Sequence, residues 1–83
     1  MSTQRMSAEA PIPHHRYRHY KGNEYEVVGV ALQTETRIPL VVYKPLYPCE
    51  FNLFARPLAM FMESVTVDGE KVSRFTHIGP MQN

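Results

Sequence analysis

Short apolar runs, separated by turn residues, fill most of the chain between residues 15 and 75. These runs are rich in aromatic and β-branched side chains, which fit the pleated surface of a strand. The residues between the runs are mainly glycine, proline, asparagine and aspartate. The pattern therefore predicts an all-β domain of about five short strands with one short helical turn. We expect strands near residues 15–20, 25–33, 40–44 and 51–55, and a hairpin formed by residues 63–67 and 70–75.

Two turns and one bend are expected at glycine positions. Asp68-Gly69, between two alternating runs, is the strongest short-range hairpin signal in the chain. Gly22 and Asn23 tolerate positive φ and end the first strand. The run Val27–Leu32 is apolar on both faces, so we expect a long strand that bends at Gly29.

Prolines limit the remaining elements. Pro39 and Pro45 flank the third strand, and we expect them to end it because proline donates no ladder hydrogen bond. Pro57 suits the first position of a helix, and Leu58, Phe61 and Met62 follow at helical spacing. One or two helical turns are therefore expected within residues 56–62.

These elements favour a small SH3-like barrel or a strongly curled antiparallel sheet, because closure hides strand edges. An open antiparallel sheet is the alternative, and it would need a dimer partner to cover its second face. We expect residues 1–13 to be a flexible N-terminal arm, residues 14–76 to be a single small β domain, and residues 77–83 to be a frayed C-terminal tail.

Composition indicates the number of domains and the cellular compartment, but it does not indicate the function. The 83 residues allow one core, and the single cysteine, Cys49, excludes an internal disulfide and favours a reducing compartment. No apolar stretch is long enough for a membrane helix and no secretory signal is evident, so a cytoplasmic protein is expected. The net charge of +1 argues against a protein that coats nucleic acid by charge alone.

The octapeptide His14–Lys21 alternates cations with aromatic residues, as surfaces that bind single-stranded nucleic acid do. The alternative is a solvated strand face whose tyrosines edge the core. A metal site is not expected, because His15 and His19 would stand ~13 Å apart on a strand. Cys49 is a poor further ligand, and no cofactor motif is present.

Arg56 is the most suggestive single position. Flanked by apolar residues, it should be partly buried, and a buried guanidinium needs a carboxylate or carbonyl partner. Glu35 or Glu63 is the expected partner if Arg56 is structural, whereas a cleft-facing Arg56 would hold an anionic ligand. An enzyme that uses Glu35 with His19 is a third possibility. No Ser, His and Asp arrangement stands out, so a non-enzyme is favoured.

The run Tyr17–Val27, together with Thr34-Glu35-Thr36, Val41-Val42-Tyr43 and Arg56-Pro57, resembles the family called domain of unknown function 1653. The resemblance spans about residues 17 to 75 and implies a short, chiefly bacterial protein without an established activity. The chain departs from the family pattern at Pro48-Cys49-Glu50, where a glycine-containing turn is usual. It departs again at Phe54, where tryptophan is common.

The leading hypothesis is a β-barrel binding module for an anionic or nucleotide-like ligand, single-stranded nucleic acid or a partner segment. An interaction module that acts through the apolar run Val27–Leu32 and through Met60 and Met62 is the alternative. The candidate ligand-binding residues are His19, Tyr20, Lys21, Glu35, Tyr43 and Arg56.

Overall fold

The computed structural model describes residues 10–81, which form seven strands and one helical turn. All strand pairs are antiparallel, so the predicted mostly β class is confirmed. The elements are β1 His15–His19, β2 Glu24–Gln33, β3 Ile38–Pro45, β4 Phe54–Pro57, α2 Leu58–Phe61, β5 Ser64–Val67, β6 Glu70–Ser73 and β7 Phe75–Pro80.

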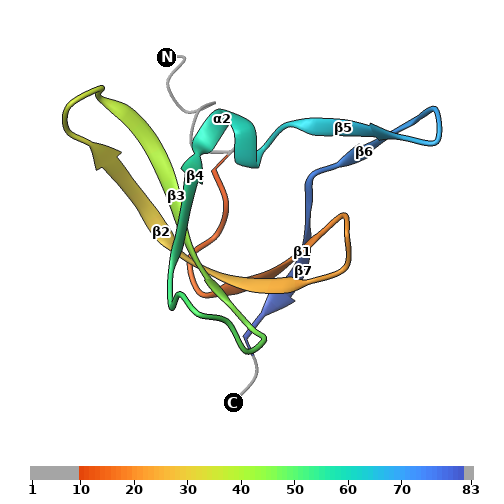
Figure 1. Ribbon diagram of the computed structural model, residues 1–83, viewed down its shortest axis with the longest axis horizontal. Helices are drawn as coiled ribbons and strands as arrows, with labels where there is room; N and C mark the ends of the chain where they lie inside the picture. The colour runs from red at the N-terminus through yellow and green to blue at the C-terminus, as the bar shows by residue number, and fades with distance from the viewer. Residues whose placement is uncertain (1–9, 82–83) are drawn as a thin grey trace.

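Five strands make one sheet in the order β4-β3-β2-β1-β7, while β5 and β6 form a separate hairpin. No ladder joins the edge strands β4 and β7 within residues 10–81, and neither a closed barrel nor a strongly curled sheet is found. The β2–β3 and β5–β6 hairpins extend to opposite sides, with α2 between them (Figure 1).

The predicted bend in β2 is present. The register with β3 shifts between Val27 and Gly29, so Val28 is an extra, unpaired residue. Such a bulge increases the local twist of a strand and redirects the residues after it. Val27, before the bulge, is fully buried, whereas Val30, after it, is about half exposed. The bulge therefore separates the core half of β2 from the projecting half.

The prediction that Pro39 and Pro45 limit the third strand is confirmed at Pro45, the last residue of β3, and is wrong at Pro39, because β3 begins at Ile38. Both lie within β3, paired with β2 opposite Leu32 and Tyr25. The short strand β4 pairs only with Leu40–Tyr43, so β3 has an open side at each proline. Because no neighbour on that side requires an N–H donor, proline is tolerated there.

The core is a cluster of aromatic rings on one face of the sheet. Phe61, the last residue of α2, is 1 % exposed and stacks on Phe75 with ring centroids 4.0 Å apart. One helical turn therefore covers the centre of the cluster. The buried residues of this cluster are Tyr17, Tyr25, Val27, Val41, Tyr43, Phe61 and Phe75, with Tyr47, Phe54 and Leu58 packed against them.

Both predicted flanking segments need correction. Residues 77–80 are not a frayed tail, because they continue β7, which pairs with β1 along its free side. Gly79 and Pro80 disfavour strands, which explains why the pattern gave no strand signal. In the expected N-terminal arm, Pro11 is buried and the Ile12 N–H donates to the Tyr17 hydroxyl at 2.9 Å. The rest of the arm, residues 1–9, lies outside the described residues.

Candidate functional site

Arg56 projects from β4 on the face of the sheet that carries the core. Its Nε donates a hydrogen bond to the Tyr43 hydroxyl at 3.1 Å, and its guanidinium carbon lies 5.7 Å from the centroid of the Phe75 ring. The two other guanidinium nitrogens form no ion pair within residues 10–81. The structure therefore gives Arg56 neither of the carboxylate partners expected from the sequence.

Glu63 has a different partner. Its carboxylate lies 3.7 Å from a terminal nitrogen of Arg74, the residue between β6 and β7. The Arg74 Nε also donates to the Met60 carbonyl oxygen at 3.1 Å. Arg74 is thus fixed beneath α2. Arg74 was not among the predicted site residues, because a single arginine in an expected hairpin strand carries no distinguishing signal.

His19 ends β1 next to these cations. Its ring lies edge-on to Phe75 at 5.0 Å and 4.6 Å from the Tyr20 ring. Its Nδ1 accepts a hydrogen bond from the Lys21 backbone N–H at 3.1 Å. A neutral imidazole has one donor and one acceptor nitrogen, so Nε2 carries the proton.

The pKa of His19 is lowered from its usual value of 6.5. Burial contributes most, because it disfavours the charged imidazolium, and the positive charges of Arg56, Arg74 and Lys21 add to the effect. His19 is therefore neutral at pH 7 and offers an Nε2–H donor. Arg56 and His19 both contact the Phe75 ring, so the two side chains lie close together.

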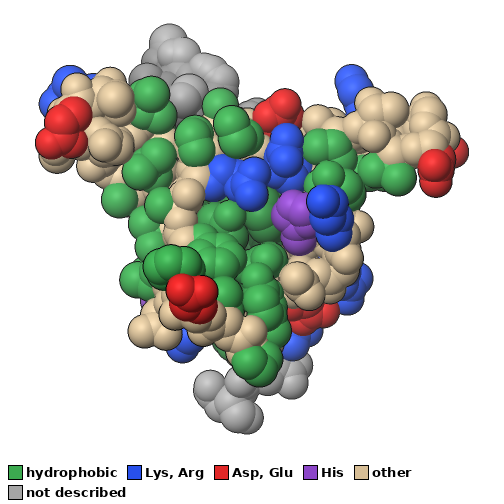
Figure 2. All heavy atoms as spheres, in the orientation of Figure 1, with side chains coloured by type: hydrophobic (Ala, Val, Ile, Leu, Met, Phe, Trp, Pro, Cys, Tyr) green, Lys and Arg blue, Asp and Glu red, His purple; other side chains and the backbone are tan. Residues whose placement is uncertain are grey.

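We refer to His19, Lys21, Arg56 and Arg74 as the basic cluster. Its members come from β1, the β1–β2 turn, β4 and the β6–β7 junction. Figure 2 shows lysine and arginine side chains around a histidine on the hollowed front face, beside a hydrophobic surface. The cluster offers N–H donors and positive charge, which is the chemistry that binds carboxylates and phosphates.

Five of the six predicted site residues meet at this cluster. His19 and Lys21 belong to it, Tyr43 holds Arg56, and the Lys21 ammonium lies 5.9 Å from the centroid of the Tyr20 ring. Glu35 does not join them. It lies in the exposed turn between β2 and β3, where its carboxylate accepts a hydrogen bond from the Thr34 hydroxyl. The Glu35–His19 pair needed for the enzyme hypothesis is not formed.

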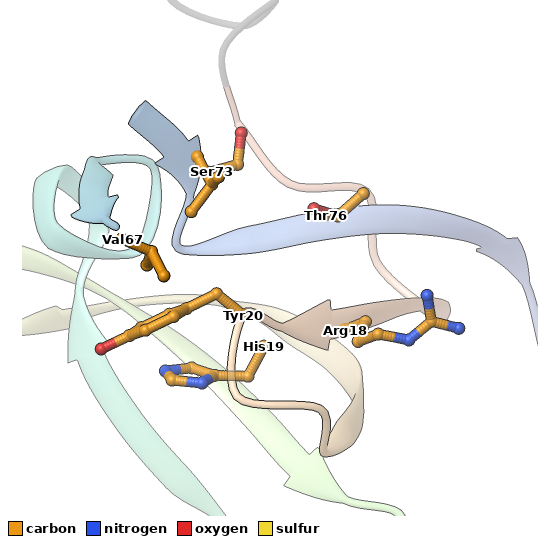
Figure 3. Close-up of a pocket in the computed structure, with 7 residues that line it drawn as sticks. Arg18, His19, Tyr20, Val67, Ser73 and Thr76 are labelled. Carbon is orange, nitrogen blue, oxygen red and sulfur yellow. The ribbon is translucent and has the colours of Figure 1, made fainter. Parts of the chain in front are cut away.

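A cavity of about 280 Å³ lies between the β1–β7 pair and the β5–β6 hairpin. In Figure 3, the Tyr20 ring lies between the His19 ring and the Val67 side chain. The one cation that lines the cavity, Arg18, is paired with Glu24 at 3.2 Å. The cavity therefore has less free positive charge than the basic cluster. Its lining residues are Arg18, His19, Tyr20, Val67, Val72, Ser73 and Thr76.

The remaining histidines form local contacts. His15 Nδ1 and His77 Nε2 are 2.7 Å apart across β1 and β7, and His14 lies 3.6 Å from Glu26. Within residues 10–81, no group of three or more metal-ligating side chains is present. Between residues 10 and 81, no helix has the length and apolarity needed to cross a membrane.

Tyr25 and Tyr47 share a hydrogen bond of 2.9 Å between their hydroxyls at the edge of the aromatic cluster. Burial raises the pKa of Tyr25 to about 12, and the bond to Tyr47 adds to this shift. Tyr25 is therefore uncharged at physiological pH. Its ring packs in the aromatic cluster of the core and supplies no charge to the site.

Comparison with known proteins places the chain in a family. The family described as "Protein of unknown function (DUF1653)" matches residues 15–77. The chain is also similar to a crystal structure of a DUF1653 protein from Bordetella bronchiseptica, with a TM-score of 0.77 and 32% identity. That match covers 87% of this chain and 94% of the other. No curated protein matches the chain. The chain therefore belongs to the DUF1653 family.

Proposed function

We propose that the protein is a binding module whose basic cluster holds the anionic group of a small ligand. The observation that carries this proposal is Arg56, a half-buried guanidinium without a carboxylate partner among residues 10–81. A partly desolvated charge is costly unless something compensates it. A bound anion would provide that compensation.

Arg56 is prepared for such a contact. The bond from its Nε to Tyr43 and the Phe75 ring beneath it restrict the side chain. Its two terminal nitrogens remain for a carboxylate or phosphate, which arginine can bind through two parallel hydrogen bonds. The His19 Nε2–H and the Lys21 ammonium provide further hydrogen-bond donors, one on a short side chain and one on a long side chain. Preorganised donors lower the entropy cost of binding.

The charge distribution favours a small anion over a long nucleic-acid strand. Arg16 and Arg18, the two arginines of β1, both lie near the Glu24 carboxylate, at 3.8 and 3.2 Å. Their charge is partly neutralised. A strand-binding groove would instead need a track of free cations along the phosphate backbone. In the basic cluster, Arg74 lies 3.7 Å from the Glu63 carboxylate, whereas Lys21 and Arg56 form no ion pair within residues 10–81.

The pKa of His19 provides a test with sulfate, an anion that stays doubly charged between about pH 5 and pH 8, where histidine titrates. Bound sulfate would offset the charges of Arg56, Arg74 and Lys21, so the lowered pKa of His19 should rise. Because binding and protonation are linked, sulfate should also bind more tightly as pH falls through the lowered pKa of His19. NMR of the imidazole C–H groups measures both effects, with His19→Gln assigning the signal.

Arg56→Gln is the matched control for this titration. Removing the guanidinium charge should raise the His19 pKa without sulfate and reduce the further rise on adding it. If the midpoint of His19 stays the same at every sulfate concentration, the anion does not bind at the basic cluster and the proposal fails.

An interaction module is the second candidate, and one observation favours it. On the β2–β3 hairpin, Val28, Val30 and Leu32 are each between 42% and 48% exposed, and Val30 and Leu32 project on the same face. Contiguous exposed apolar side chains often mark a protein-binding surface. Amide shifts on these residues that grow with protein concentration, and that ignore added anions, would indicate self-association through this hairpin instead of anion binding.

A further inference from the structure

We infer that Phe54 is the platform for a planar ring in the ligand, so the ligand is an aromatic or heteroaromatic anion. This inference rests on the proposed function, because the basic cluster would hold the charged group. It adds the part of the ligand that is not charged, and it assigns that part to a residue of β4.

The geometry places Phe54 beside Arg56. The two residues are two positions apart on β4, so they project on the same face about 7 Å apart. Both contact Tyr43: its hydroxyl accepts the Arg56 Nε–H, and its ring lies edge-on to Phe54 at 5.7 Å. One buried tyrosine thus fixes the spacing between a guanidinium and an aromatic ring.

Phe54 is also the accessible ring of this group. The two rings that contact Arg56 directly, Tyr43 and Phe75, are only 3% and 7% exposed. Phe54 is only partly buried and packs against the cluster from its edge. Figure 2 shows hydrophobic surface directly next to the lysine and arginine side chains of the front face. A flat ring attached to an anion fits this combination, because rings stack on aromatic faces.

Tyr20 is the competing platform, and its surroundings argue against it. Its ring already lies 4.6 Å from the His19 ring, and the Lys21 ammonium is 5.9 Å from its centroid. In Figure 3, Val67 lies on the side of the Tyr20 ring away from His19. The side of Tyr20 toward Val67 opens into the cavity, whose one lining cation, Arg18, is paired with Glu24. Phe54 is preferred because it shares Tyr43 with Arg56.

The test compares three monoesters with the same charged group: methyl phosphate, cyclohexyl phosphate and phenyl phosphate. With the wild-type chain, we expect phenyl phosphate to bind about tenfold more tightly than methyl phosphate, as expected for one stacking contact. Cyclohexyl phosphate should gain less, because its ring is not planar. Amide NMR shifts give the dissociation constants and show that each variant is folded.

Variants then assign the gain to one ring. Phe54→Leu should remove the preference for phenyl phosphate and leave methyl phosphate binding unchanged, while Phe54→Trp should keep or increase it. Phe51→Leu, at a residue that is 63% exposed, and Tyr20→Leu are the matched controls and should keep the preference.

The outcomes separate the two claims. If methyl phosphate binds at the basic cluster but phenyl phosphate binds no better, the inference is wrong and the proposed function stands. The same holds if Tyr20→Leu or Phe51→Leu, but not Phe54→Leu, removes the preference. If neither ester binds the wild-type chain, the proposed function itself is wrong.

Discussion

Replacing Arg56 by alanine should weaken phenyl phosphate binding by about tenfold to a hundredfold while the domain stays folded. A hydrogen bond to a charged group contributes about 1.5–3 kcal/mol, which corresponds to this range. Arg56 has no carboxylate partner among residues 10–81 whose charge would be left uncompensated by its loss. The fold should therefore lose little more than the bond to Tyr43. NMR titration measures the affinity, and thermal unfolding measures the stability.

Lys44→Ala is the control of equal charge change. Lys44 follows Tyr43 in β3, so its side chain projects from the opposite face, and it pairs in register with Glu26. This variant should bind phenyl phosphate like the wild type. Arg56→Lys should be intermediate, because lysine keeps the charge but loses the planar fork. An Arg56→Ala variant that binds normally, or that unfolds, would contradict the role assigned to Arg56.

Replacing Phe61 by alanine should cause the largest loss of stability of any substitution considered. Phe61 is 1% exposed, stacks on Phe75 and lies edge-on to Tyr17 and Tyr43. Truncating a buried phenylalanine costs about 3–5 kcal/mol, against a total stability of about 5–15 kcal/mol for natural domains. A domain this small lies near the lower end, so most of its stability should be lost. Urea unfolding at 25 °C checks this.

Met62→Ala provides the comparison. Met62 follows Phe61 in the chain but is 45% exposed, so its truncation removes little buried surface. We expect a change within about 0.5 kcal/mol, as for most surface substitutions. If both variants unfold at the same urea concentration as the wild type, α2 does not cover the core as described.

The turn signals in the sequence predicted the turns well, whereas the fourth strand, expected at residues 51–55, lies at Phe54–Pro57. Asp68-Gly69 joins β5 to β6, and both residues have positive φ. Gly22 likewise turns between β1 and β2 with a φ of 112°. The pairing of β7 with β1 was not predictable in this way. It joins residues about sixty positions apart, and residues 77–80 have little intrinsic preference for a strand. Tertiary pairing, not local propensity, orders that segment.

The candidate site likewise combines residues that are adjacent in the sequence with residues that only the fold brings together. His19, Tyr20 and Lys21 are consecutive, so the sequence could place them together. Their approach to Arg56 depends on the sheet, where β4 and β1 lie on either side of β2 and β3. Glu35 was predicted as a partner on its residue type alone. The length of the β2–β3 hairpin carries it to the tip, away from the cluster (Figure 1).

An amide-resolved NMR titration of the wild-type chain with phenyl phosphate tests the central claim most directly. We expect saturable shifts grouped on residues 19–21, 43, 54–56 and 74–75, and a weaker affinity as salt is added, since salt screens exposed charges. An absence of saturable shifts at millimolar ligand would contradict it. Shifts confined to the outer face of β1 around Arg18 would contradict it equally.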